Sequence, residues 1–361
     1  MRLDQAKRLR CAACLTDSPK LHPFELSSDE RCRSGVLVCG HCGAWYPVSG
    51  HVADLLPAAH AEAESRREFF EEHRVRLEEL GLSLPETAAP DPEFAAQQHQ
   101  RKHFDDLARR GDRFSYGALG RQPFQRAIRS LHFEEWAPLI RPGTLVLDIG
   151  CADGLSSFDI ARFDVEVIGI DISGEAIRVA SERAEHEHYG NVTFMVADAD
   201  SLPIADRAMD SVLCYGSLHH VPAPERTLQE ATRVLKPGGS YLGVENNTTP
   251  LRPIFDALMR LRPIWLEEAG AEAQIGSKEL HRWTDGSDLA LDTRATVYVP
   301  PQLCNLIGYR ASRRLLRLTD WVFGRIPWVR RWGGLISIRG RTPQPDTGPA
   351  RRREVAVGAD T

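Results

Sequence analysis

The stretch VLDIGCADG at residues 146–154, followed by VIGIDIS at residues 167–173, decides the fold of this chain. An apolar strand leads into a glycine turn and a second apolar strand ends in an acid, the pattern by which a doubly wound α/β sheet holds a nucleoside. A side chain at Gly150 or Gly154 would block the approach of a ligand to the backbone. Asp171 ends the second strand, where its carboxylate can accept hydrogen bonds from both ribose hydroxyls. We therefore predict a Rossmann-like sheet that binds a nucleoside cofactor.

The charge of the glycine turn selects among nucleoside cofactors. A dinucleotide site would carry G-x-G-x-x-G, with the pyrophosphate at a helix N-terminus. Asp148 and Asp153 would repel a pyrophosphate but suit a ligand that carries an ammonium and a sulfonium group. Together with VADADSLP at 196–203, DSVLCYGSLHH at 210–220 and RVLKPGG at 233–239, the turn resembles class I S-adenosylmethionine-dependent methyltransferases. The resemblance is strong over about residues 136–243.

This resemblance implies S-adenosyl-L-methionine as the cofactor and an α/β sheet of seven strands, the last of them antiparallel. Because ligands bind beyond the carboxyl ends of parallel strands, Asp148 and the turn should face the methionine part, and Asp171 the ribose. The resemblance further implies that Asp198 and the Ala199 amide contact the adenine. The predicted cofactor-binding residues are Asp148, Gly150, Cys151, Gly154, Asp171, Ile172, Asp198, Ala199 and Tyr215.

Strand and helix patterns alternate through the second half of the chain, which predicts a parallel sheet with right-handed crossovers. A helix over 223–235 ends at a Pro-Gly-Gly stop. The predicted core strands are 145–149, 167–172, 192–196, 211–215 and 241–245, and an edge hairpin over 295–299 and 335–339 completes the sheet.

Four of the eight cysteines form two Cys-x-x-Cys pairs near the N-terminus. Cys11, Cys14, Cys39 and Cys42 match a tetrahedral structural zinc site, so we predict a zinc ribbon over residues 1–58. Cys32 or His41 could replace one ligand, and unligated cysteines in a packed domain are the alternative. The following AWYPVSGHVADLLP at 44–57 resembles the end of the zinc ribbon of some bacterial rRNA guanine methyltransferases.

Residues 59–135 are predicted to be a helical linker and a segment that covers the cofactor. A helix over 62–80 precedes a proline-rich break at 85–92, and a second helix over 94–110 follows it. In related methyltransferases such a segment folds over the cofactor, so Phe104, Phe114 and Tyr116 could close the pocket. Aromatic packing between helices is the alternative.

Methyl transfer from a sulfonium is an in-line displacement at carbon, so the protein must mainly align the donor with the acceptor. A general base is needed only when the acceptor loses a proton as it attacks. His219, His220 and Glu245 follow the fourth and fifth strands and are the candidate catalytic residues. A structural or positioning role is the alternative for both histidines.

The methyltransferase domain is predicted over 136–341, with a substrate insert at 248–286. Tyr116, His281, Arg282 and Trp283 are the candidate acceptor contacts. Residues 315–332 mix tryptophan with arginine as an interfacial helix does; packing against the sheet is the favoured interpretation, and peripheral membrane contact is the alternative. The Pro-, Gly- and Arg-rich tail at 342–361 is predicted to be disordered.

Two enzyme functions and one non-enzymatic function fit these features. The leading prediction is methyl transfer to oxygen or nitrogen of a small-molecule acceptor, such as a secondary metabolite, sugar or lipid precursor. A formal net charge of −5 and scattered arginines disfavour nucleic acid, although the ribbon keeps an rRNA or tRNA base methyltransferase as the alternative. A non-catalytic protein that binds the cofactor and recruits a partner is the third. Without a membrane-spanning run or a signal-peptide pattern, the sequence predicts a cytoplasmic protein and leaves its oligomeric state open.

Overall fold

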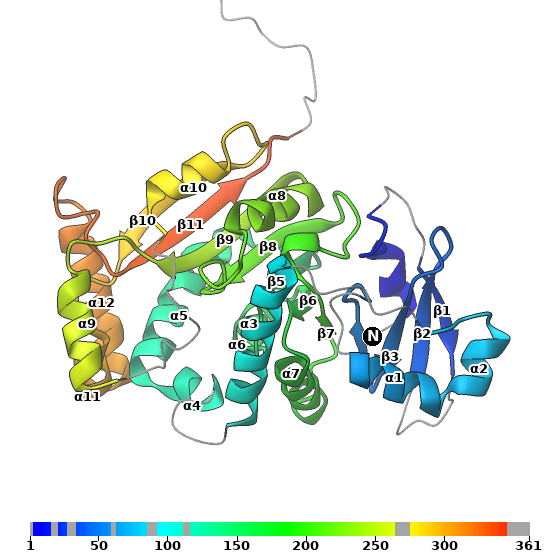
Figure 1. Cartoon of the computed structure of the whole chain (residues 1–361). Coiled ribbons are helices and arrows are strands. Elements are labelled where there is room, and N and C mark those ends of the chain that lie inside the picture. The colour runs from blue at the N-terminus through cyan, green and yellow to red at the C-terminus, as the bar shows by residue number, and fades with distance from the viewer. Residues whose placement is uncertain are drawn as a thin grey trace, which may run out of the picture.

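One continuous sheet of eleven strands runs through the protein (Figure 1). The computed structural model describes residues 3–15, 21–26, 34–58, 63–84, 92–110, 116–263 and 275–344. The strand order is β1-β2-β3-β4-β7-β6-β5-β8-β9-β11-β10. The strands are β1 (Leu21–Glu25), β2 (Ser34–Cys39), β3 (Trp45–Ser49), β4 (Val52–Asp54), β5 (Leu145–Ile149), β6 (Glu166–Asp171), β7 (Val192–Val196), β8 (Met209–Tyr215), β9 (Leu235–Asn246), β10 (Ala290–Thr296) and β11 (Leu335–Arg341).

Seven of these strands form the predicted Rossmann-like sheet. Strands β7, β6, β5, β8 and β9 are parallel, and β11 is antiparallel to both β9 and β10. The predicted core strands agree with the observed ones, except that β9 begins at Leu235, before the predicted start at residue 241. The edge hairpin is also confirmed, although β10 lies some residues before the predicted 295–299.

The prediction of a seven-stranded sheet is wrong, because the N-terminal ribbon extends the same sheet. Strand β4 pairs in parallel with β7, Ala53 opposite Met195, and the Leu55 N–H donates to the Val196 carbonyl (2.8 Å). Leu37 and Tyr46 of the ribbon belong to the same buried cluster as the central strands. So short a segment has too few apolar side chains for a core of its own, and it completes its core against the sheet.

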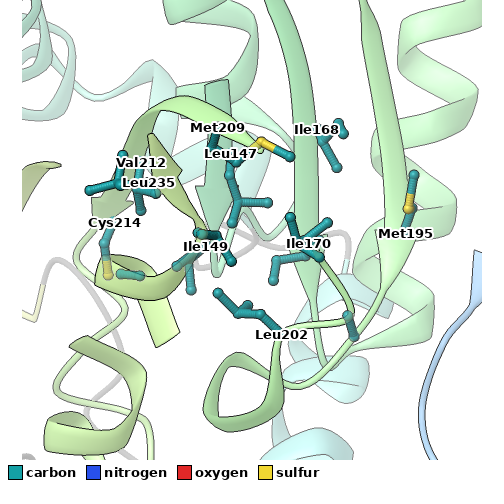
Figure 2. Close-up of a cluster of buried hydrophobic side chains, with 14 of the residues drawn as sticks. Leu147, Ile149, Ile168, Ile170, Met195, Leu202, Met209, Val212, Cys214 and Leu235 are labelled. Atoms are coloured by element: carbon teal, nitrogen blue, oxygen red, sulfur yellow. The ribbon is translucent and has the colours of Figure 1, made fainter. Parts of the chain in front are cut away.

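The central part of that cluster lies on one side of the sheet (Figure 2). Its members come from alternate positions of neighbouring strands, because successive side chains of a strand point to opposite faces. They include Leu147 and Ile149 of β5, Ile168 and Ile170 of β6, and Met195 of β7.

Twelve helices occur among the described residues and flank the sheet. The predicted helix over 62–80 is divided at His73, and Phe69, Phe70 and Leu77 pack around Trp45 of the ribbon. The helices are α1 (Ala63–Glu72), α2 (Arg74–Glu79), α3 (Pro92–Arg109), α4 (Tyr116–Arg121), α5 (Pro123–Trp136), α6 (Leu155–Ala161), α7 (Gly174–His186), α8 (Pro224–Val234), α9 (Arg252–Leu261), α10 (Ser277–Trp283), α11 (Pro301–Ile307) and α12 (Tyr309–Phe323).

Several predicted features lie at or beyond the ends of the described segments. Cys32, Phe114, the break at 85–91 and the tail from residue 345 onward lie outside the described residues. Thr342, placed by the sequence in the tail, is bound to the sheet, because its hydroxyl donates to the Lys236 carbonyl (2.7 Å) and accepts from the Gly239 N–H (3.0 Å). None of the described helices is long and apolar enough to cross a bilayer.

Candidate active site

A cavity of about 400 Å³ lies at the carboxyl ends of β5, β6, β8 and β9. This is the edge at which parallel α/β sheets bind ligands. Helices α3, α4, α5, α9 and α11 complete its wall. Of the predicted cofactor-binding residues, seven line the cavity: Gly150, Cys151, Asp171, Ile172, Asp198, Ala199 and Tyr215.

The glycine turn is required by the protein's own packing. Gly150 (φ +67°) and Gly154 (φ +83°) both adopt left-handed backbone conformations. A Cβ at Gly150 would lie 2.3 Å from the Ser217 Cβ, and one at Gly154 would lie 2.7 Å from the Phe194 ring. Gly154 does not itself line the cavity. The sequence thus located the turn correctly, but the close contacts that exclude side chains there are intramolecular.

Two acids of the first strand and turn differ in their position. Asp148 lies beneath the turn and does not line the cavity, because its Oδ2 accepts from the Ser157 hydroxyl on α6 (2.6 Å). Its Oδ1 has no hydrogen-bond partner, and burial raises the pKa of Asp148 to about 7. Asp153 lines the cavity, and burial raises its pKa to about 6 although Arg183 opposes the shift. The acid that faces the ligand space is therefore Asp153.

Asp171 and Asp198 stand at the ends of neighbouring strands. Asp171 accepts from the Ala152 N–H and the Ser173 N–H (both 2.9 Å), and burial raises its pKa. Asp198 accepts from the Asp200 N–H (2.9 Å). Each carboxylate oxygen has more than one lone pair. Both acids can therefore accept further hydrogen bonds from a ligand in the cavity.

Helix α3 covers this end of the cavity. Phe104 lines it and lies edge-on to the His220 ring (5.1 Å between centroids). The Gln100 side-chain amide donates to the His220 carbonyl. Asp105 fixes α3 to the start of α7, since it accepts from the Ser173 hydroxyl (2.5 Å) and the Glu175 N–H (3.1 Å). The predicted covering role of Phe104 thus has a structural basis, and its aromatic packing holds as well.

The three candidate catalytic residues meet where β8 and β9 end. The His219 Nδ1–H donates to the Glu245 Oε2 (2.6 Å), and Glu245 also accepts from the Leu218 and His219 backbone N–H groups. The Asn246 amide lies 3.3 Å from His219 Nε2. Glu245 is fully buried, so its carboxylate fixes the ring orientation of His219. Glu245 thus holds the position of the residue that orients a general base, and His219 holds the position of the base.

His220 is held differently from His219. Its ring lies tilted by 43° against that of His219, with centroids 3.9 Å apart, and both residues line the cavity. Burial, with smaller contributions from the neighbouring His219 and His103, lowers the pKa of His220 to about 3. His220 is therefore neutral and its ring supports that of His219.

The structure does not bring His281, Arg282 and Trp283 to the cavity. They lie on α10, where the His281 ring donates to the Ser277 carbonyl (2.6 Å) and Trp283 packs against the main core. Tyr116 begins α4, but its side chain lies outside the described part of the chain. The other helix of the same insert supplies the wall instead, through Arg252, Phe255, Asp256 and Met259 of α9. The apolar spacing of residues 254–261 was the sequence signal that could have identified α9 as part of the cavity wall.

The sequence analysis did not identify His132, which contacts the cavity-lining Tyr215 and does not itself line the cavity. Its Nδ1 lies 2.9 Å from the Tyr215 hydroxyl, and burial lowers the pKa of His132 to about 3. The ring is therefore neutral and holds Tyr215 at the cavity wall. No motif marks this histidine, because it lies within an ordinary amphipathic helix, α5.

The two cysteine pairs converge as predicted. The Sγ atoms of Cys11, Cys14, Cys39 and Cys42 all lie within 4.8 Å of one another. Sulfurs bound tetrahedrally at a Zn–S distance of about 2.3 Å would be about 3.8 Å apart. The Cys11–Cys42 and Cys14–Cys39 Sγ distances are 3.6 and 3.8 Å. The donor set and its spacing fit a zinc ion, and the His41 backbone N–H donates to the Cys39 sulfur (3.4 Å).

Comparison with known proteins gives one matching family model and several relatives. The family described as "Methyltransferase domain" matches residues 140–284. A demethylmenaquinone methyltransferase of Symbiobacterium thermophilum is 33% identical over 43% of this chain and 62% of its own length. A ubiquinone biosynthesis O-methyltransferase of Alkalilimnicola ehrlichii is 32% identical over 41% and 62%. A demethylmenaquinone methyltransferase of Thermobifida fusca is 30% identical over 52% and 80%. The chain thus spans less than two thirds of the first two relatives.

Proposed function

Because this chain belongs to the S-adenosyl-L-methionine-dependent methyltransferases, we propose that it methylates an oxygen or nitrogen of a small-molecule acceptor. The observation that carries the proposal is the cavity, which is lined both by ligand-facing acids and by the His219–Glu245 pair. The relatives' names support an acceptor of the quinone-precursor kind, an apolar molecule with ring hydroxyls. The apolar wall of Phe124, Ile128, Phe255 and Met259 agrees with such an acceptor.

The acids assign the cofactor's parts to this cavity. Asp171 binds the ribose hydroxyls, while Asp198 and the Ala199 N–H bind the adenine. Asp153 and the turn at 150–152 bind the cationic methionine part, and Tyr215 bounds the space beside the reactive methyl group. When bound, the cofactor supplies an electrophilic methyl group with a good leaving group. Asp148 lies beneath the turn with one oxygen unpartnered, and a bound cation above it would favour the ionised form of this carboxyl group.

The protein's own contribution is alignment and proton removal. A hydroxyl acceptor becomes a stronger nucleophile as it loses its proton, and His219 is the base that takes it. Glu245 holds the Nδ1–H side of the ring, which leaves Nε2 as the basic nitrogen. The acceptor would replace the Asn246 amide as the partner of Nε2. The side chains of the pair are buried, and residues of α3 line the cavity together with them.

Substitution of His219 tests this assignment. His219→Asn should lower turnover of radiolabelled methyl transfer to a phenolic acceptor by roughly a hundredfold or more, because the base is lost. Cofactor affinity, measured by calorimetric titration, should stay nearly unchanged. His281→Asn, on exposed α10, is the matched control and should keep full turnover. A His219 variant as active as the control would rule out base catalysis at this residue.

The cysteine cluster carries a second assignment. We propose that Cys11, Cys14, Cys39 and Cys42 hold one structural zinc ion, which ties the start of the chain to the β2–β3 turn. The Tyr46 hydroxyl lies 3.1 Å from the Cys11 sulfur and can donate to the thiolate. No group in the cluster lies at the cavity, so the ion stabilises the ribbon and takes no part in the transfer.

The alternative of RNA base methylation finds less support. It would need a basic surface that joins the ribbon to the cavity. Among the described residues, α1 and α2 beside the ribbon carry four arginines but six glutamates. The most basic of the described helices is α12, with four arginines and one aspartate, and it lies at the β10 end of the sheet, whereas the ribbon forms the β1 end (Figure 1).

A further inference from the structure

Three helices near the β10–β11 end of the sheet expose apolar side chains on one face. Helices α9, α11 and α12 lie side by side there (Figure 1), and Gln302 of α11 donates to the Arg262 carbonyl just after α9 (3.4 Å). Their exposed apolar residues recur at spacings of three, four or seven, so within each helix they share a face. We call these residues, together with Trp328 in the turns that follow α12, the outer face; it consists of Ile254, Leu261, Leu303, Leu306, Ile307, Leu318, Trp321, Val322 and Trp328.

The outer face is not needed to hold these helices in place. Their opposite sides are packed, with Met259, Cys304 and Leu316 buried. On the outer face, by contrast, Leu261 is 83%, Trp328 70% and Trp321 57% exposed. Nine of the twelve exposed large hydrophobic side chains among the described residues lie here. Such a concentration of exposed apolar area marks an interaction site.

The charge around the outer face identifies its partner. Residues 252–263 and 301–334 contain ten arginines and two aspartates, in a chain of formal net charge −5. The two acids are engaged internally, Asp256 with Arg252 and Asp320 with the Val297 N–H. Arg313 and Arg317 pair with Glu134 of α5, and the other surrounding exposed arginines are Arg260, Arg262, Arg310, Arg314, Arg325, Arg330 and Arg331. A partner must therefore offer an apolar layer and negative charge together.

The arginines and tryptophans are also paired locally. The Arg325 guanidinium lies 4.4 Å from the Trp321 ring centroid and donates to the Trp321 carbonyl (2.7 Å). This places a cation directly beside an exposed indole. Tryptophan and arginine together suit the boundary between lipid headgroups and acyl chains, where the ring is buried and the charge meets phosphate.

We propose that the outer face docks on a membrane surface that contains anionic phospholipid. Trp321, Trp328 and the exposed leucines enter the headgroup boundary, and the arginines bind lipid phosphates. Apolar insertion and a basic cluster together supply the two signals that stable membrane attachment takes.

Docking in this orientation would also define the source of the acceptor. Phe255 and Met259 of α9 and Gln302 of α11 line the cavity from the inner side of the same helices. The apolar end of the cavity therefore lies directly behind the outer face. An amphiphilic acceptor could pass from the membrane into the cavity without crossing water. This step rests on the proposed function, whereas the docking itself does not.

Sedimentation with lipid vesicles tests the docking, with the full chain and no cofactor. The protein should bind vesicles of equal parts phosphatidylcholine and phosphatidylglycerol, and binding should weaken as salt is added. Trp321→Ser combined with Trp328→Ser should weaken this binding by about tenfold or more. Val75→Ser is the matched control, because Val75 is equally exposed but lies on α2 beside the ribbon.

Several outcomes would overturn the proposal. They are no binding to these vesicles, equal binding to phosphatidylcholine alone, or a loss in the Val75 variant equal to that in the tryptophan variant. Light scattering that shows a dimer dissociated by the tryptophan substitutions would assign the outer face to a second copy instead. Calorimetric titration of the same preparation with S-adenosylmethionine separates the two proposals. Cofactor binding without vesicle binding contradicts the docking alone, and the reverse contradicts the proposed function alone.

Discussion

Asp153 shows how a single carboxyl group can make ligand binding depend on pH. Burial raises its pKa to about 6, so it is largely protonated below that pH in the ligand-free protein. A cationic ligand favours the ionised form. For folding the sign is opposite, because a raised pKa stabilises the folded state below the unfolded pKa, and this contribution is lost as the pH rises through about 6.

We therefore expect the affinity for S-adenosylmethionine to rise between about pH 5 and about pH 7. Asp153→Asn should flatten this rise, leaving only what Asp148 and Asp171 contribute, and Asp292→Asn on exposed β10 should not change it. Calorimetric titration at each pH measures the effect. Identical pH profiles for the Asp153 variant and the wild type would assign the titration to another group.

At the residue scale, the sequence predicted most of the residues that line the cavity. It did not predict the contacts that orient their side chains. Asp171, Asp198 and Tyr215 could be placed because each follows a strand that its apolar pattern reveals. Asp148 could not be placed, because the direction of its side chain depends on a hydrogen bond to Ser157 nine residues later. The orienting contact between His219 and Glu245 likewise joins two strand ends that only the folded sheet brings together.

At the scale of helices and strands, the sequence patterns predicted where these elements form. Tertiary packing determined which of them line the cavity. The insert at 248–286 was expected to form the acceptor wall through α10, yet α9 lines the cavity and α10 packs beside α8 and β10. Both helices are amphipathic in sequence, and periodicity does not say against which surface a helix packs. Periodicity was equally unable to predict the environment of α12. Leu316 on this helix is buried, whereas Trp321 is exposed.

For the whole molecule, the main surprise is that the ribbon and the sheet form one structure. The pairing of β4 with β7 could not be predicted, because a three-residue strand carries no signal for its partner. Its consequence is that Leu37, Tyr46 and Leu55 share a core with the central strands. Stability of the ribbon and of the catalytic part should therefore be coupled.

Removal of the metal tests this coupling. Wild-type protein should contain about one zinc per chain, and Cys39→Ser combined with Cys42→Ser should abolish it. The variant should unfold at a lower temperature in one transition, because the ribbon shares its core with the sheet. Cys304→Ala, a buried cysteine between α11 and α5, is the control that keeps its zinc. A metal-free wild type would refute the zinc site, and separate melting of ribbon and sheet would refute the coupling.

The most direct test of the central claim is calorimetric titration of the full chain with S-adenosylmethionine, repeated with Asp171→Ala. The cavity acids predict binding by the wild type and an affinity reduced by about 1.5–3 kcal/mol in the variant, the contribution of a hydrogen bond to a charged group. Absence of binding by the folded wild-type protein, or equal affinity of the two proteins, would contradict the assignment of this cavity to the methyl donor.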